Sequence, residues 1–195
     1  MNGQSTPLRL FWAEFRENKI AVVALVIVVL LILLALFASV VSPQNPYDLS
    51  NLSLLDSRRP PGFVGSGGYT HILGTDPQGR DLLSAIFYGL RISIQIGLAA
   101  GFVSLTIGTS LGITAAYVGG RVESLIMRLV DLQLSFPAIL LALVIVALLG
   151  QGKAQLISAL VAAQYAYFAR TAYGAAKAER GKDYIEAAVA TPLST

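Results

Sequence analysis

The chain contains no cysteine and a single histidine, and these absences exclude several kinds of chemistry. Without cysteine there can be no disulfide, no thiolate metal cluster and no cysteine nucleophile. His71 alone cannot build a zinc site, because such sites need several protein ligands. We therefore expect no catalytic residue, no metal and no cofactor in this chain.

Charge is also scarce, at 13% of residues, whereas soluble domains carry roughly 25%. The chain is 55% hydrophobic and its mean hydropathy is +0.67, which indicates a membrane protein in contact with lipid. The formal net charge of +3 is small and spread along the sequence. It suits orientation in a membrane, and nothing in its pattern indicates nucleic acid binding.

Four apolar segments predict an all-α membrane protein with about four transmembrane helices. Residues 20–41 form a run of 22 residues without a charge, and about 20 are needed to span a membrane. This run is longer than the apolar core of a cleavable signal, so we expect it to be retained. The other predicted spans are residues 92–118, 132–149 and 154–176.

The segments between these spans have distinct compositions. Residues 1–19 are predicted to be a tail whose Leu10, Phe11 and Phe15 favour a short helix on the membrane surface. Residues 42–91 are predicted to lie outside the cytoplasm, as a Pro- and Gly-rich loop followed by an amphipathic helix at 81–91. Residues 121–131 are predicted to be a charged loop. Residues 177–182 are expected to continue the fourth helix until Gly181 permits a turn into the C-terminal segment, 177–195.

The distribution of Lys and Arg orients the predicted spans. Of the 14 basic residues, nine fall in the N-terminal tail, the second connection and the C-terminal end, and five fall on the opposite side. Positive charge is enriched in cytoplasmic loops. Both termini are therefore predicted to be cytoplasmic.

Four glycines recur on one face of the second predicted span, namely Gly97, Gly101, Gly108 and Gly112. At about 100° per residue they fall within an arc of roughly 60°. Small residues let helices approach closely in lipid. This face is therefore predicted to pack against other helices.

Three motifs have more than one interpretation. The sequence around Ser110 matches the nucleophile elbow G-x-S-x-G, but it lies in an apolar helix without a histidine base, which favours helix packing over a hydrolase. The turn at residues 150–153 lacks the first glycine and the Ser or Thr of a phosphate loop, so no ATP binding is expected. Asp131 is interpreted as an interfacial cap of the third span paired with Arg128, or as an intramembrane functional acid.

One polar run is dense in turn and helix-cap chemistry. It reads Leu73-Gly74-Thr75-Asp76-Pro77-Gln78-Gly79-Arg80-Asp81-Leu82-Leu83-Ser84 and continues to Tyr88-Gly89-Leu90-Arg91. Three further motifs follow in order: Met127-Arg128 to Asp131 with Leu134-Ser135-Phe136-Pro137, then Phe168-Ala169-Arg170, and then Asp183-Tyr184-Ile185-Glu186-Ala187-Ala188. Together they resemble the second permease subunit of bacterial ATP-binding-cassette (ABC) importers for dipeptides, oligopeptides and nickel.

The resemblance implies a fold, a function and partners. The fold would be that of a type I importer permease in the bacterial inner membrane, forming part of the translocation path. The implied partners are a second permease subunit in a heterodimer, two ATPase subunits, which would hydrolyse the ATP, and a periplasmic substrate-binding protein. Asp183, Tyr184, Glu186, Ala187 and Ala188 would form the segment that docks on one ATPase, with Glu186 as its charged contact. The loop at 42–80 would face the binding protein or cover the pore entrance.

The sequence departs from the family pattern near its end. Pro192 stands where the family has a glycine, and two further membrane helices of the family are absent, which suggests a truncated or frame-shifted chain. The alternative function is therefore a non-transporting membrane scaffold or remnant of such a permease. The substrate stays open among dipeptides, oligopeptides, nickel, glutathione and opine-type compounds.

Overall fold

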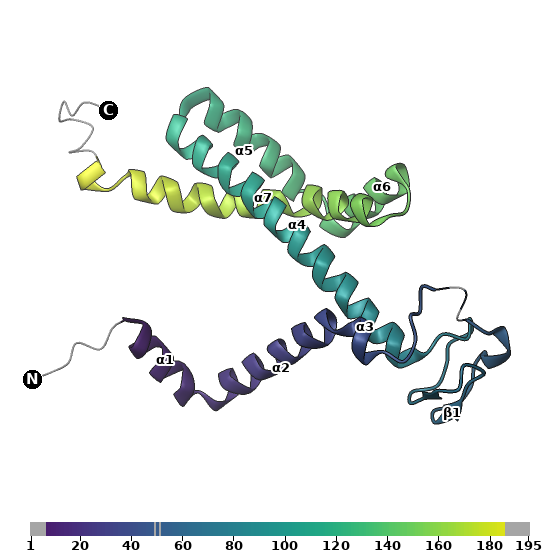
Figure 1. Ribbon diagram of the computed structural model, residues 1–195. Coiled ribbons are helices and arrows are strands. Elements are labelled where there is room, and N and C mark those ends of the chain that lie inside the picture. The colour runs from purple at the N-terminus through teal and green to yellow at the C-terminus, as the bar shows by residue number, and fades with distance from the viewer. Residues whose placement is uncertain (1–6, 49, 51, 186–195) are drawn as a thin grey trace, which may run out of the picture. The chain divides into compact units, whose positions relative to one another are not determined.

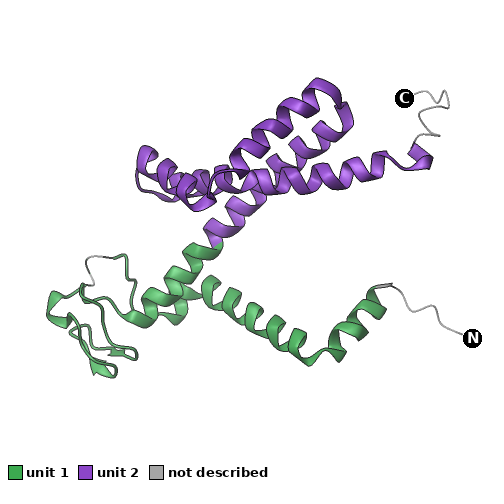
Figure 2. Cartoon of the chain, turned by 180° about the vertical axis from the view of Figure 1, so that it is seen from behind, with its two compact units in different colours: residues 1–94 green, residues 95–195 purple. Residues whose placement is uncertain are grey.

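The structure is a computed structural model that describes residues 7–48, 50 and 52–185. Its chain divides into two compact units, Met1–Ile94 and Gln95–Thr195, which are coloured separately in Figure 2. The described part is mainly helical, in agreement with the predicted all-α class (Figure 1). Each unit is best understood by itself.

The first unit begins with two helices. α1 (Pro7–Glu17) confirms the short helix predicted in the N-terminal tail, while its place on the membrane surface stays a prediction; Phe15 stacks against Phe11 and Trp12. α2 (Lys19–Leu36) follows, and Asn18 caps it by accepting a hydrogen bond from the backbone N–H of Ala21. A turn at Phe37 and the short α3 (Ala38–Val41) complete the predicted first span.

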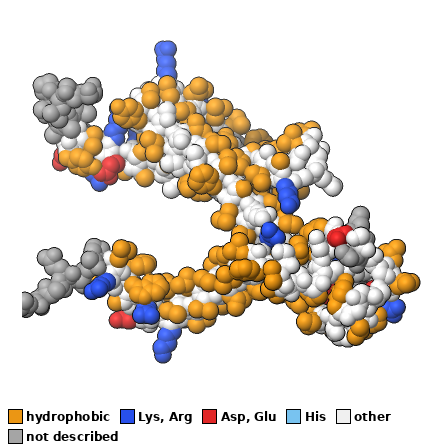
Figure 3. Space-filling view, viewed as in Figure 1, with side chains coloured by type: hydrophobic (Ala, Val, Ile, Leu, Met, Phe, Trp, Pro, Cys, Tyr) orange, Lys and Arg blue, Asp and Glu red, His pale blue; other side chains and the backbone are white. Residues whose placement is uncertain are grey.

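α2 has almost no core of its own. Apolar side chains cover it on the visible face (Figure 3), and most of them are exposed. Exposed apolar residues on all sides of a long helix are expected where the surroundings are lipid or partner helices. α2 is one of two helices among the described residues that are long and apolar enough to cross a membrane.

The loop of the first unit is more ordered than its Pro- and Gly-rich sequence suggests. It contains a 3-10 helix, η2 (Leu54–Asp56), and a hairpin of β1 (Phe63–Val64) and β2 (Thr70–His71). The strands pair antiparallel, with Phe63 opposite His71. An isolated bridge joins Thr75 to Asp81 and leads the chain into α4.

α4 (Leu82–Val118) is a single helix of 37 residues. The amphipathic helix predicted at 81–91 and the span predicted at 92–118 are therefore continuous. It is the second helix that qualifies as a membrane span, and it runs from the first unit into the second. No residue type within 88–95 breaks a helix strongly enough to separate the two parts.

The charged loop predicted at 121–131 is wrong, because these residues form α5 (Gly120–Leu134). Four charges within eleven residues suggested a loop, but Met127 and Val130 lie buried at helical spacing, with Ile126 and Leu134 packed beside them. Arg121 and Arg128 are exposed, whereas Glu123 and Asp131 lie one turn either side of Met127 and pair with basic residues of α7.

The third predicted span is bent. α5 ends at Leu134, and α6 (Ala138–Leu149) begins after Pro137 at an angle of 89° to α5. A proline lacks the N–H that a continuous helix needs, which explains the break. The pair adds a third membrane crossing to the described residues only if it counts as one span.

α7 (Lys153–Arg180) is 28 residues long and packs along α5 and α6. It is long enough to span a membrane but not apolar enough to qualify by composition, so the fourth predicted span stays a prediction. The core of the second unit lies where α4, α5 and α7 meet, around Ala115, Met127, Val130, Ala166 and Ala169. Its small side chains permit close helix packing.

Candidate functional sites

Asp81 is the centre of a buried network at the start of α4. Its side chain is fully buried. One carboxylate oxygen accepts hydrogen bonds from the backbone N–H and the hydroxyl of Ser84, both at 2.7 Å, which is the geometry of a helix N-cap. The other oxygen lies 3.0 Å from Nδ1 of His71, which is also buried. Asp81 thus ties the hairpin to the first turn of α4.

The same network extends to the segment after α3. The backbone N–H of Asp81 donates to Oε1 of Gln44 at 2.8 Å, and the N–H of Gln44 donates to the hydroxyl of Ser84 at 3.3 Å. Sequence reasoning placed Asp81 at a helix start but missed Gln44 and His71 as its partners. Their separations along the chain, 37 and 10 residues, carry no local pattern that could have indicated them.

Two signature glycines allow close backbone approach. Gly74 has φ +79°, and a Cβ there would meet the carbonyl of Arg59. Gly79 has φ +77°, and its Cβ would overlap the carbonyl oxygen of Ser53. Both the left-handed backbone and the lack of space require glycine. Between them, Thr75 donates to the carbonyl of Asp56 and accepts from the N–H of Arg59 at 2.8 Å.

Asp76 organises the turn that carries the rest of the signature. Its carboxylate accepts from the N–H groups of Gln78 at 2.8 Å and Arg80 at 3.0 Å, and from Nε of Arg80 at 2.7 Å. Partial burial raises the pKa of Asp76, but the hydrogen bonds from Arg80 and Gln78 outweigh it and lower the pKa overall. The six signature residues, Gly74, Thr75, Asp76, Gly79, Arg80 and Asp81, thus form one connected loop structure.

Asp56 is a second buried acid in this loop, and the sequence did not single it out. It accepts from the hydroxyl of Ser66 at 2.6 Å and the N–H of Ser66 at 2.9 Å. These hydrogen bonds, chiefly that of the hydroxyl, hold the pKa of Asp56 below its ordinary value of 3.8. Nearby His71 and Arg59 act in the same direction. The carboxylate therefore stays charged at neutral pH and fastens η2 to the hairpin.

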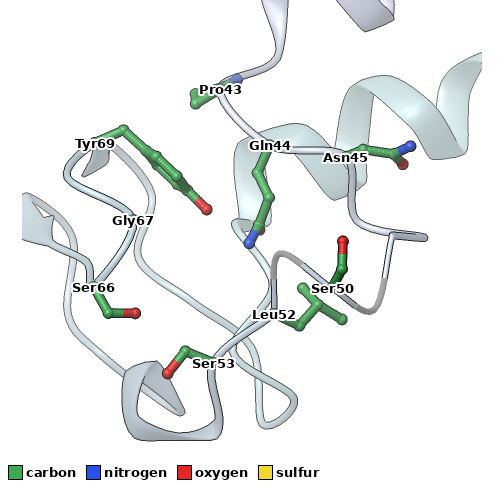
Figure 4. A pocket seen from close by; sticks show the side chains of 9 residues that line it. All are labelled: Pro43, Gln44, Asn45, Ser50, Leu52, Ser53, Ser66, Gly67 and Tyr69. Atoms are coloured by element: carbon green, nitrogen blue, oxygen red, sulfur yellow. The ribbon is translucent and has the colours of Figure 1, made fainter.

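A polar cavity of about 390 Å³ opens beside this network (Figure 4). Its walls include Gln44, Ser53, Ser66 and Tyr69. Burial raises the pKa of Tyr69, so its hydroxyl is neutral at physiological pH. Hydroxyl and amide groups of this kind suit hydrogen bonding to a neutral polar partner. Within the part of the chain that the structure describes, no cluster of acids and histidine could hold a metal ion.

The glycine face of α4 divides into two halves. Gly108 lies against the backbone of Tyr165 and Ala169 of α7, and Gly112 lies against the backbone of Ala169 and Tyr173. No neighbouring atom would lie within 4 Å of a Cβ at Gly97 or Gly101. The described structure therefore uses only the second half of the face for close packing. Ser110 lies within the same helix and not at a strand-to-helix turn, so the hydrolase interpretation has no structural basis.

Asp131 does not cap the third span, and that prediction is wrong. It lies within α5, one turn before its end, and its carboxylate pairs with Arg170 of α7. These two residues come from different motifs, lie 39 positions apart along the chain and meet in space. Both side chains are about half exposed, so the pair contributes little to stability by itself.

The C-terminal end of α7 is joined to two other helices. Nη1 of Arg180 donates to the carbonyls of Ala116 at 2.6 Å and Tyr117 at 2.9 Å, in the last turn of α4. Glu123 of α5 pairs with Lys177 and accepts a hydrogen bond from the hydroxyl of Tyr173. These residues lie outside the motifs that the sequence singled out.

The predicted coupling segment begins directly after this end. As predicted, α7 continues past residue 177 and ends at Arg180, with Gly181 as its C-cap. Glu179 holds Lys182 at 2.6 Å and accepts a hydrogen bond from the hydroxyl of Tyr184. Asp183 lies between Lys182 and Tyr184 in the sequence and is exposed. Glu186, Ala187, Ala188 and Pro192 lie outside the described residues.

Comparison with known proteins explains why these features occur together. Residues 6–61 match the family described as the N-terminal TM domain of oligopeptide transport permease C. Residues 108–195 match the binding-protein-dependent transport system inner membrane component. The chain belongs to this permease family. The resemblance inferred from the motifs is thereby confirmed, as are the inner-membrane location and the type I importer permease fold class.

Individual relatives of this chain are named as peptide and glutathione transport proteins. The dipeptide transport system permease protein DppC of Haemophilus influenzae is 33% identical over 180 residues, which are 92% of this chain and 60% of that protein. The di/tripeptide transport system permease protein DppC of Pseudomonas aeruginosa is 38% identical over 93% of this chain and 59% of its own length. The glutathione transport system permease protein GsiD of Pectobacterium atrosepticum is 40% identical over 60% of this chain and 39% of its own length. The chain thus spans about 60% of the length of the first two relatives.

Proposed function

We propose that this chain is a transmembrane permease subunit of an ATP-driven ABC importer and forms part of a path for peptides or related small solutes. The observation that carries the proposal is the agreement between the family matches and the four motifs, which follow the family's order from residue 73 to residue 188. The names of several relatives specify a cargo, which is a dipeptide, an oligopeptide or glutathione. These names support the proposed substrate class.

We assign different tasks to the two ends of the chain's helices, on the basis of the charge distribution. The charge distribution favours a cytoplasmic position for the N-terminal tail and the end of α7. The loop of the first unit then lies on the periplasmic side, where its rigid hydrogen-bonded surface is available to a substrate-binding protein. The segment after Arg180 lies on the cytoplasmic side, where ATPase subunits would bind.

The proposed assembly contains a second permease subunit, two ATPase subunits, a periplasmic binding protein and membrane lipid. The sequence of this chain lacks a complete phosphate-binding loop, so hydrolysis of ATP is assigned to the separate subunits. The exposed apolar surface of α2 supports contact with lipid or with helices of the second permease. The signature-loop residues are proposed to hold the periplasmic loop in shape and not to bind cargo.

The coupling role of the C-terminal motif is tested by Glu186→Lys. In an importer complex assembled with this chain, we expect the substitution to abolish the coupling of ATP hydrolysis to uptake, because it reverses the charge offered to the ATPase. Glu186→Gln is the matched variant, since it keeps the size and removes only the charge, and it should retain more uptake. Unchanged uptake and complex assembly in Glu186→Lys would contradict the assignment.

A further inference from the structure

Arg180 occupies a position that the coupling motif does not explain. Its guanidinium caps the C-terminal end of a different helix, donating to the carbonyls of Ala116 and Tyr117 at 2.6 and 2.9 Å. The last four carbonyls of an α-helix have no partner within the helix, and this end carries the negative pole of the helix dipole. A cation with two bonds to this end is therefore a specific connection between α7 and α4.

The connection lies on the turn that joins α4 to α5. Gly119 and Gly120 form this turn with φ of 73° and 58°, and a Cβ on Gly119 would lie 3.4 Å from Nη1 of Arg180. On its other side, Glu123 in the first turn of α5 pairs with Lys177 of α7. The last turn of α7 is thus joined by side-chain contacts both to the end of α4 and to the start of α5.

The segment that follows α7 is held by the last turn of α7. Glu179 precedes Arg180 directly and holds both Lys182 and Tyr184. A displacement of residues 182–184 therefore acts first on the turn that contains Arg180. From there the two hydrogen bonds to Ala116 and Tyr117 lead into α4, the longest helix of the described chain.

We propose that Arg180 is a positioning residue that transmits movement of the segment after α7 to the C-terminal end of α4. This inference rests on the proposed importer function, and it concerns the link within this chain and not the contact with the ATPase. Arginine suits the role because its planar group places several donors in fixed directions, so that one side chain can satisfy two carbonyls. A lysine keeps the charge but offers a compact and more mobile ammonium group.

The functional test compares three variants in proteoliposomes that contain the complete importer complex. Arg180→Ala should reduce uptake about tenfold while the ATPase subunits still co-purify, because a cation at a helix C-terminus contributes free energy on this scale. The number of ATP molecules hydrolysed for each solute transported should rise. Arg180→Lys should restore part of the uptake. Arg121→Ala, which removes an exposed arginine from the first turn of α5, is the matched control and should transport like the unaltered chain.

Two results of this assay would overturn the inference. One is unaltered uptake and unaltered ATP consumption in Arg180→Ala. The other is loss of the ATPase subunits from the purified complex, which would show that Arg180 is needed for assembly and not for transmission. If the complex with the unaltered chain does not import, the proposed function itself fails, and that outcome is separate from both.

A second measurement examines the link without requiring transport. The chain has no cysteine, so Tyr117→Cys and Ala176→Cys introduce a unique pair on the two helices. Both positions line the same apolar pocket at this end of the second unit. A short bifunctional thiol reagent should join them, and the yield should fall several-fold when Arg180→Ala is added, since the two ends are then less firmly held. An equal yield with and without Arg180 would refute the link.

Discussion

Replacement of Asp81 by alanine should disrupt the loop of the first unit at its most buried point. The carboxylate accepts two hydrogen bonds from Ser84 and contacts His71, and all three side chains are fully or almost fully buried. Loss of an N-cap costs about 1 kcal/mol, and each buried polar group left without a partner costs about 1–3 kcal/mol. We therefore expect a local destabilisation of about 3 kcal/mol or more.

Hydrogen exchange of the protein in lipid nanodiscs measures this effect. At 1.4 kcal/mol for each factor of ten, a loss of about 3 kcal/mol should accelerate exchange of the Ser84 amide roughly 150-fold. Asp81→Asn should be milder, because its amide oxygen can still accept from Ser84 and its N–H can donate to a His71 tautomer. Asp48→Ala is the control, since Asp48 accepts from Ser50 at an exposed site. Equal protection in Asp81→Ala and the unaltered chain would refute the reasoning.

Two further predictions concern helix packing and pH. Gly112→Val should weaken the packing of α4 on α7 by at least about 2 kcal/mol, because its Cβ would overlap the backbone of α7. Gly97→Val is the control and should have little effect in this chain. Thermal unfolding in detergent compares the two variants, and an equal loss of stability in both would contradict the close contact at Gly112. Asp56 has a lowered pKa in the folded loop, so its stabilising contribution is fully present above pH 3.8 and is lost as the pH falls through the folded-state pKa. Limited proteolysis of the loop should therefore accelerate on acidification below pH 3.8, and Asp56→Asn should remove most of that dependence; an unchanged acid response in the variant would show that another group controls it.

The helical class and most helix positions follow from the sequence because long apolar runs in lipid must satisfy their own backbone hydrogen bonds. The end of α7 was also predictable, since Gly181 marks it locally. α5 was predicted as a loop because its charges were counted without its periodicity. The helical spacing of the apolar residues Ile126, Met127, Val130 and Leu134 was the signal in the sequence that could have identified it.

The contacts within the sites were less predictable than the elements. The position of Asp81 at a helix start could be predicted from the local sequence. Its pairing with His71 could not, because it depends on a hairpin that brings the two residues together. The bonds of Arg180 to the end of α4 cross more than 60 residues. Such contacts depend on how helices pack, and a single sequence holds no periodic signal for them.

A permease role in an ATP-driven importer is the function proposed for this chain. It is tested most directly by uptake of a labelled dipeptide and a labelled oligopeptide into proteoliposomes that contain the chain with its second permease, ATPase subunits and binding protein. We predict uptake that requires both ATP on the cytoplasmic side and binding protein on the other. Uptake that is independent of ATP, or a complex in which this chain can be omitted without loss of transport, would contradict it.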